Sequence, residues 1–189
     1  MVRSPRPLRP FAGQAQLEAF SLDAMALNDA GILRLQFVLQ GPLAQLRLPA
    51  PAPEPQRRDG LWASTCFEAF VGIVGMESYW EINLCPSGHW NLYALRAYRQ
   101  DLRAEPSVQT LPFRRSQQLI ATGIERIELQ LDLDLAPLTR PLVDQQHELT
   151  LEISATAVLE HRHLGCSYWA WQHCGPQADF HRRESFLPL

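Results

Sequence analysis

The sequence predicts an all-β protein that folds as a two-sheet antiparallel β-sandwich with a jelly-roll-like arrangement. Apolar and polar residues alternate over much of the 189-residue chain, which is the spacing of half-buried strands. No long stretch keeps apolar residues three and four positions apart, so no long amphipathic helix is expected. Turn-forming residues separate about eight to ten short runs, a pattern typical of sandwiches and barrels.

The amino-terminal part is expected to be an irregular segment at residues 1–13 followed by a hairpin. The runs 17–27 and 32–41 alternate and flank the turn sequence Asn-Asp-Ala-Gly. Prolines then occupy alternate positions from 49 to 55, which excludes a paired central strand and favours an extended polyproline loop. Too few residues precede this loop to build a separate core, so residues 1–189 are expected to form one domain.

Three runs at residues 66–74, 78–85 and 89–98 are predicted to form a meander, with a short Pro-Ser-Gly turn before the third. Residues of like parity share a face of a strand. The core faces of the first two strands are expected to hold Phe67, Ala69, Val71, Ile73, Trp80, Ile82 and Leu84. The opposite face then holds Glu68 from the first strand and Tyr79, Glu81 and Asn83 from the second. Two orientations of the third strand remain open, because either Asn91 with Tyr93 or Trp90 with Arg96 can join this face.

The carboxy-terminal half predicts a long polar loop at residues 99–118 and then strands at 123–135 and 148–158. Each strand has one apolar face, and Ser154 and Thr156 belong to the set expected to face solvent. Residues 135–146 can hold one helical turn that prolines break. A last strand at 167–173 and a tail at 178–189 complete the chain, with Trp169 and Trp171 interpreted as core residues.

Composition and charge exclude several classes of function. A net charge of -3 gives no electrostatic basis for a nucleic-acid partner. All 17 basic residues are Arg, which excludes Schiff-base chemistry and a P-loop lysine. No window approaches the roughly 20 apolar residues of a membrane span, and no signal-peptide pattern is present, so we expect a cytoplasmic protein. Cysteines 66, 85, 166 and 174 are far apart and are expected to be free thiols.

The outer face of the predicted meander has the composition of a sugar site. In protein–sugar complexes, pairs of sugar hydroxyls form hydrogen bonds with carboxylates, amides and guanidinium groups. The C–H face of the sugar ring packs on the plane of an aromatic side chain. The competing interpretation is a solvated face on which Glu68 and Glu81 pair with Arg96 and Arg99, each pair contributing roughly 0.2 to 1 kcal/mol. The sequence leaves both interpretations open.

Other residues carry weaker signals. Trp62 follows an Asp-Gly pair just before a strand, so its indole is either a binding platform or a plug over the end of the sandwich. Glu68 and Glu81 also fit the paired carboxylates of a glycoside hydrolase. His161 and His163 share a face, but no third ligand stands at a recognisable spacing, so no metal ligand and no catalytic residue is assigned.

Three segments, at residues 58–72, 78–99 and 167–189, resemble the DOMON-like proteins. This bacterial group is related to family 9 carbohydrate-binding modules and to haem- or sugar-binding DOMON domains, and the resemblance extends from about residue 57 onward. It implies a jelly-roll-like sandwich with a ligand pocket on one sheet face. The sugar-binding relatives hold a saccharide between aromatic rings, with carboxylate, amide and arginine side chains as hydrogen-bond partners. The resemblance implies that the corresponding ligand-binding residues here are Trp62, Glu68, Glu81, Asn83 and Arg99.

The haem-binding relatives use a Met and a His as axial ligands, for which Met76 and either His89 or His173 are available. The sequence as a whole predicts a non-catalytic domain that binds a small-molecule or saccharide ligand, without a cofactor or a membrane partner. Haem binding, hydrolysis of a glycoside and docking of a protein partner on the sheet face are the alternatives. The predicted ligand-binding residues are Trp62, Glu68, Tyr79, Glu81, Asn83, Asn91, Tyr93, Arg99 and His173.

Overall fold

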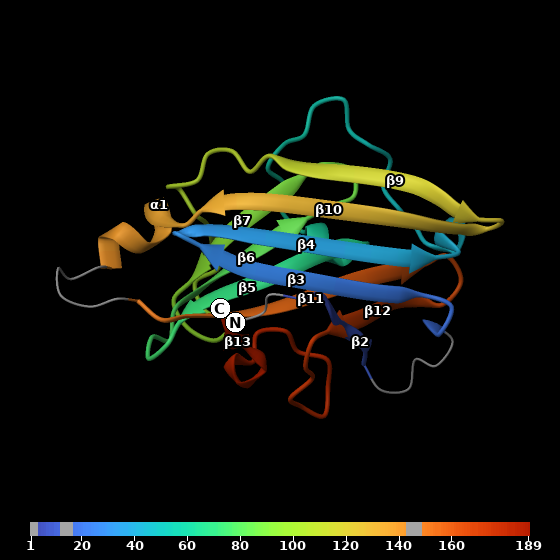
Figure 1. Ribbon diagram of the computed structural model, residues 1–189. Helices are drawn as coiled ribbons and strands as arrows, with labels where there is room; N and C mark the ends of the chain where they lie inside the picture. Colours follow the sequence, from blue (N-terminus) through green and yellow to red (C-terminus); the bar gives the residue numbers. More distant parts are fainter. Residues whose placement is uncertain (1–3, 12–16, 143–148) are drawn as a thin grey trace.

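The computed structural model describes residues 4–11, 17–142 and 149–189 and forms two antiparallel sheets packed face to face (Figure 1). The predicted all-β two-sheet sandwich is confirmed. The first sheet has the order β1-β3-β4-β10-β9, with β1 Arg6–Pro7, β3 Ser21–Asp29, β4 Ile32–Gly41, β10 Ile124–Asp134 and β9 Phe113–Ala121. The second has the order β2-β12-β11-β5-β6-β7-β8. Its strands are β2 Arg9–Pro10, β12 Gly165–Ala170, β11 Leu151–His161, β5 Cys66–Ile73, β6 Tyr79–Leu84, β7 Trp90–Leu95 and β8 Arg103–Ala104, and β13 Leu187–Pro188 pairs with β11.

Helices are short and lie between the strands. The helix α1 Ala136–Thr139, followed by the 3-10 helix Arg140–Leu142, provides the predicted helical turn, and the rest of that prediction lies outside the described residues. Further 3-10 helices occupy Leu43–Gln45, Leu61–Ala63 and Arg183–Ser185. Within the described ranges, no helix has the length and apolar character needed to cross a membrane.

The core lies between the two sheets and follows the predicted alternation. The apolar parity of β10, which includes Leu129 and Leu131, is buried, while Asp132 and Asp134 are exposed. The predicted core faces of β5 and β6 belong to the same cluster, and the rings of Phe37 and Phe67 meet across the sheets at 5.4 Å. Each large apolar side chain buried there contributes about 1.5 to 3 kcal/mol.

The prediction of an irregular segment at residues 1–13 is wrong for part of it. Strand β1 pairs with β3 at the edge of the first sheet, and β2 pairs with β12 at the edge of the second. Leu8, which lies between the two strands, is buried. Proline is tolerated in edge strands, so a proline-rich segment can pair briefly with each sheet in turn.

The prediction of a long loop at residues 99–118 is also wrong in part. Strand β8 pairs with β7, and β9 runs from Phe113 to Ala121 alongside β10. β9 is an exposed edge strand, so its side chains need not alternate between core and solvent. Arg57 holds the intervening loop through its guanidinium, which donates to the carbonyl oxygens of Glu105 and Val108 and lies over the Trp90 ring at 4.5 Å.

The outer face of the second sheet is covered rather than solvated. Every residue of β5 and of β6 is buried, although half of each strand faces away from the core. The carboxy-terminal segment lies against this sheet (red in Figure 1) and returns to it as β13. Arg183 anchors the segment by donating to Glu152 and to the carbonyl oxygens of Ser78 and Ile73. Its guanidinium fills the space where a Cβ on Gly72 would lie, which explains the glycine in mid-strand.

Candidate functional site

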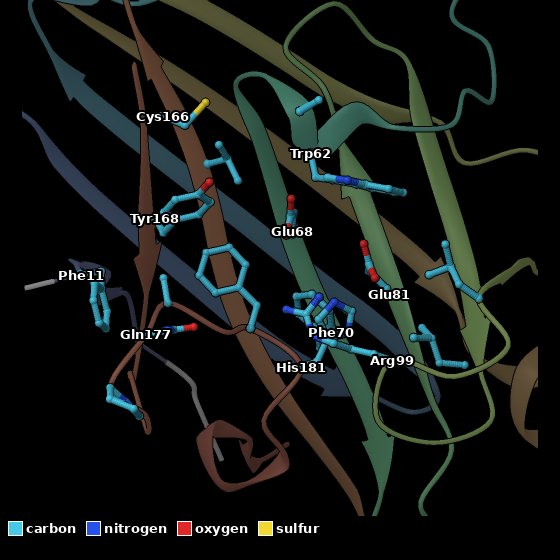
Figure 2. Close-up of a pocket in the computed structure, with 17 residues that line it drawn as sticks. Phe11, Trp62, Glu68, Phe70, Glu81, Arg99, Cys166, Tyr168, Gln177 and His181 are labelled. Atoms are coloured by element: carbon cyan, nitrogen blue, oxygen red, sulfur yellow. The ribbon is translucent and has the colours of Figure 1, made fainter. Parts of the chain in front are cut away.

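A pocket of about 840 Å³ opens on the outer face of the second sheet (Figure 2). Its floor comes from β5 and β6, and its walls come from β12, the 3-10 helix Leu61–Ala63, the loop after β7 and the carboxy-terminal segment. The size lies within the range of small-molecule sites. The lining includes Phe11, Trp62, Glu68, Phe70, Glu81, Leu95, Arg99, Leu102, Cys166, Tyr168, Gln177, Phe180 and His181.

Two carboxylates lie on the floor of this pocket. Glu68 pairs across the sheet with Asn83, and Phe70 pairs with Glu81, so both glutamates lie on the outer face of adjacent strands. Only 2% of Glu68 and 4% of Glu81 is exposed. Asn83 Nδ2 donates to Glu81 Oε1 at 2.8 Å, whereas Glu68 Oε1 is buried without a hydrogen-bond partner among the described residues.

Two buried hydroxyl groups on β11 lie next to the outer-face residues of β5 but do not line the pocket. Thr156 lies opposite Glu68, and Ser154 lies opposite Phe70. Both side chains are fully buried, and their Oγ atoms have no hydrogen-bond partner within the described ranges. Our prediction that they face solvent is therefore wrong, because β11 is an inner strand whose outer face is covered by its neighbours and by the carboxy-terminal segment.

Burial shifts the protonation of both carboxylates. It raises the pKa of Glu68 well above its usual value, and the nearby charge of Glu81 raises it further. Burial also raises the pKa of Glu81, against the opposing effects of the Asn83 hydrogen bond and the Arg99 charge. The structure pairs Arg96 with Asp101 and Arg99 with Asp179. The interpretation of Glu68 and Glu81 as ion-pair partners of these arginines on a solvated face is therefore wrong.

The raised pKa values predict that the ligand-free protein loses stability as pH rises. Folded Glu68 keeps its proton at pH values where an unfolded Glu, with a pKa of about 4.3, has lost it. Its contribution to the free energy of unfolding is full below that value and is lost as pH passes the raised folded pKa. Glu68→Gln should therefore flatten the fall in melting temperature as pH rises from about 4.3 into the range where folded Glu68 loses its proton.

Thermal melts of wild type and Glu68→Gln across that pH range check this prediction. Glu77→Gln is the matched control, since Glu77 is exposed in the turn between β5 and β6 and should follow the wild-type curve. Equal slopes for wild type and Glu68→Gln would show that Glu68 titrates normally in the folded protein.

Aromatic side chains flank the carboxylates. Trp62 and Tyr168 are 39% and 41% exposed, a large fraction for rings of this size. In the view of Figure 2, Glu68 lies between the Tyr168 ring and the Trp62 indole, and Glu81 lies beside it. Trp62 is therefore a wall of the pocket, and the alternative of a plug over the end of the sandwich does not apply.

Asn91 and Tyr93 support Trp62 from below. Register places Asn83 opposite Asn91 and Glu81 opposite Tyr93, which settles the orientation of the third strand. Tyr93 contacts the Trp62 indole edge-on at 5.5 Å and donates to Asp59 Oδ1 at 2.9 Å. Asn91 Nδ2 donates to the same Asp59 oxygen at 3.0 Å. These bonds hold the loop that carries Trp62 against the sheet.

Asp179 joins the two walls opposite Trp62. Its carboxylate accepts from Arg99 Nη2 at 3.0 Å and from the Tyr98 hydroxyl at 2.5 Å, which connects the loop after β7 to the carboxy-terminal segment. Although burial acts to raise the pKa of Asp179, these hydrogen bonds outweigh it and the pKa is lowered. Arg99 has a φ of 53°, a left-handed conformation uncommon for a non-glycine residue. The Asp179 bonds therefore fix an otherwise unfavourable turn at the rim.

His181 packs below this junction. The distance between its Nδ1 and the Tyr79 hydroxyl is 2.8 Å, and the same hydroxyl accepts from the Arg99 backbone N–H at 3.2 Å. Burial, together with the Arg99 charge, lowers the pKa of His181 to about 4. The imidazole is therefore neutral near pH 7 and supplies no positive charge to the pocket.

The structure brings together most of the predicted site residues but gives them different places. Trp62, Glu68, Glu81 and Arg99 line the pocket. Tyr79, Asn83, Asn91 and Tyr93 are buried beneath it and position the lining. His173 does not line the pocket itself: its ring contacts the lining residue Phe11 at 5.2 Å, and its Nε2 is 2.9 Å from the Arg9 carbonyl oxygen. The role of all nine residues in ligand binding stays a prediction.

Sequence reasoning missed several lining residues. Phe70 shares the parity of Glu68, and Tyr168 has the parity opposite to the core residue Trp169, so the strand pattern contained a signal for both. Phe180, His181 and Gln177 belong to the carboxy-terminal segment, whose residues show no strand periodicity. Nothing in the sequence placed that segment over the second sheet.

The residues considered as alternative haem or metal ligands are not brought together at this site. Met76 and His89 lie in the turns at opposite ends of β6, and neither lines the pocket. His161 Nε2 is 3.3 Å from Gln45 Oε1. Among residues 4–11, 17–142 and 149–189, no group of three or more His, Cys, Asp or Glu side chains is arranged to hold a metal ion. All four cysteines are free, as predicted.

Comparison with known proteins identifies structural relatives only. No family model matches the sequence, and no curated protein matches it. A protein of Bacteroides uniformis ATCC 8492, described as a candidate carbohydrate-binding protein, superposes with a TM-score of 0.70 and 14% identity, over 97% of this chain and 84% of its own. A family 9 carbohydrate-binding module from Caldicellulosiruptor kristjanssonii, solved with glucose, gives a TM-score of 0.42 and 10% identity, over 88% of this chain and 73% of its own. The first likeness shows a shared fold.

Proposed function

We propose that this protein binds a saccharide or glycoconjugate in the pocket on its second sheet and does not transform it. The observation that carries the proposal is the buried carboxyl pair, in which Glu68 lies between the exposed rings of Trp62 and Tyr168 and Glu81 lies beside it. On this floor, Glu68 Oε1 has no hydrogen-bond partner among the described residues. The pocket therefore combines apolar walls with hydrogen-bonding groups that the protein itself leaves unused.

A saccharide matches this combination of groups. Its hydroxyls can donate to the carboxylates, and hydrogen bonds to a charged acceptor contribute about 1.5 to 3 kcal/mol each. Its ring C–H faces can pack on Trp62 and Tyr168, whose large flat surfaces are available for contact. An apolar ligand of the same size would leave the carboxylates buried without partners, which is costly.

One further consideration supports a sugar ligand. The Bacteroides uniformis protein of similar fold is described as a candidate carbohydrate-binding protein, and we extend that description to this chain as part of the proposal. Membership of the DOMON-like group, a location in the cytoplasm and the absence of a cofactor belong to the same proposal. They rest on the resemblance and the composition of the sequence.

The arrangement of the carboxylates favours binding over hydrolysis of a glycoside. A glycosidase needs an acid and a base or nucleophile that flank the scissile bond. Here Glu68 and Glu81 rise from the same face of adjacent strands and meet a ligand from one side. Glu81 is also held against the sheet by Asn83. Both groups therefore suit a floor that accepts hydroxyl protons.

A thermal-shift screen over mono- and oligosaccharides, nucleotide sugars and haem tests the proposal. A saccharide at about 100 times its dissociation constant should add roughly 2.7 kcal/mol to the free energy of unfolding, which is readily detected as a higher melting temperature. Incubating each stabilising saccharide with the protein and analysing it by chromatography should return it unchanged. A screen in which no saccharide stabilises the protein would contradict the proposal, and cleavage of a glycoside would replace it with a hydrolase.

A further inference from the structure

The pocket floor holds two buried carboxyl groups that form no ion pair with a described cation. Among the described residues, no ion pair reaches Glu68 or Glu81. Arg99 is the cation in the lining, and its guanidinium is already paired with Asp179. Arg182, the other nearby cation, faces the same Asp179 at 3.8 Å. Because Arg99 and Arg182 are paired with Asp179, a cationic group of a ligand would supply the positive charge that favours ionisation of the two buried carboxyl groups.

The walls around this floor also suit a positive charge. The negative faces of aromatic rings attract a cation, most strongly for Trp, when it lies within about 6 Å of the ring centroid. Trp62 and Tyr168 are the exposed rings beside Glu68, and Phe70 and Phe180 line the same pocket. The combination of aromatic walls and a carboxylate floor is the one that binds organic ammonium groups in water.

We propose that the saccharide bound here carries an ammonium group, as in an amino sugar, and that this group lies on the Glu68 and Glu81 carboxylates. The proposal rests on the saccharide-binding function above and specifies its ligand class. An ammonium group has three donors and no acceptor, so it matches a floor of two carboxyl groups, of which Glu68 Oε1 has no hydrogen-bond partner among the described residues. The remaining sugar hydroxyls and the ring face then contact the polar rim and Trp62.

A neutral sugar satisfies this site less completely. Its hydroxyls can donate to the carboxyl groups, but they bring no positive charge to offset the cost of ionising a buried pair. An N-acetylated amino sugar keeps the nitrogen but loses its charge and adds bulk. The ammonium form should therefore bind at least about tenfold more tightly than either neutral form, because its positive charge adds a direct electrostatic attraction to the carboxylates that neither neutral form supplies.

Isothermal titration calorimetry with matched ligands tests this inference. The probes are D-glucosamine, D-glucose and N-acetyl-D-glucosamine, the corresponding galactose series, and cyclohexylamine, which has a ring and an ammonium group but no hydroxyls. Each is titrated into wild type, Glu68→Gln, Glu81→Gln and the exposed control Glu77→Gln, with folding checked by circular dichroism. The inference predicts at least about a tenfold preference for the amino sugar in wild type and Glu77→Gln, and a preference reduced severalfold in either pocket variant.

The outcomes separate this inference from the function on which it rests. Neutral sugars that bind as tightly as their amino counterparts in wild type overturn the ammonium inference and leave saccharide binding intact. If cyclohexylamine binds as tightly as the amino sugars and neutral sugars do not bind, ammonium recognition stands and the saccharide function fails. If none of the probes and no saccharide of the thermal screen binds, both are overturned. An amino-sugar preference that persists in both pocket variants places the ammonium elsewhere and contradicts the assignment to Glu68 and Glu81.

Discussion

Replacing Glu68 and Glu81 together by Gln is expected to weaken saccharide binding by about 100-fold or more. Each carboxylate is expected to accept charge-assisted hydrogen bonds worth about 1.5 to 3 kcal/mol, and every 1.4 kcal/mol is a tenfold change in affinity. Gln keeps the size of Glu, so the pocket keeps its shape while it loses both charges. The fold should survive, because a neutral amide is easier to bury than a carboxylate. Calorimetric titration of a saccharide found in the thermal screen measures the loss.

The matched control replaces two exposed glutamates, Glu54 and Glu77, by Gln. It makes the same chemical change away from the pocket and should leave the dissociation constant within about twofold of wild type. If the pocket variant is folded and binds as tightly as this control, Glu68 and Glu81 do not contact the ligand.

Trp62→Ala is expected to weaken binding by about 10- to 100-fold, the second largest effect among the variants. Removing an aromatic anchor from a binding surface commonly costs 2 kcal/mol or more, and about 1.4 kcal/mol corresponds to tenfold. The fold should change little, because Trp62 lies on a short 3-10 helix and is 39% exposed. Trp62→Phe keeps a ring on the same side of the pocket and should retain most of the affinity. Titrations of both variants check the prediction.

Leu119→Ala is a suitable control for the loss of an exposed apolar side chain, since Leu119 lies on the edge strand β9 in the other sheet. It should bind as wild type does. Full affinity in Trp62→Ala would remove the indole from the site, and an equal loss in Trp62→Phe and Trp62→Ala would show that the contact depends on something other than a ring face.

The sandwich could be predicted wherever strand periodicity reports burial on one face. Leu129 and Leu131 on β10 alternate with polar residues because one side of that strand meets the core and the other meets solvent. The same rule separated Glu68 and Glu81 from the core sides of β5 and β6. The position of both carboxyl groups on one face of the sheet could therefore be predicted from the alternation of residues along two strands.

Periodicity fails where a face is covered by a segment without periodicity of its own. Ser154 and Thr156 look like solvent-facing residues because alternation cannot distinguish a wet face from a second buried one. The cover comes from the carboxy-terminal segment, whose attachment through Arg183 to Glu152 joins residues far apart in the chain. Strand β9 was missed because it has no apolar face for alternation to reveal. It is an exposed edge strand, and backbone pairing with β10 stabilises it.

Asn91 and Tyr93 were predicted to contact the ligand, and in the structure they support the pocket wall. Their residue types fit sugar contacts, but their side chains are directed to Asp59 and hold the loop that carries Trp62. That bond requires Asp59 to come within hydrogen-bonding distance of β7, a contact between segments more than 30 residues apart. Residue type alone indicated a polar site, and the three-dimensional contacts divided it into a lining and its supports.

A crystal structure of the protein with the saccharide that gives the largest thermal shift tests the central claim most directly. The account predicts a sugar ring between Trp62 and Tyr168, with at least two of its polar groups within hydrogen-bonding distance of the Glu68 and Glu81 carboxylates. A saccharide bound at another surface, with the pocket on the second sheet left free, would contradict it.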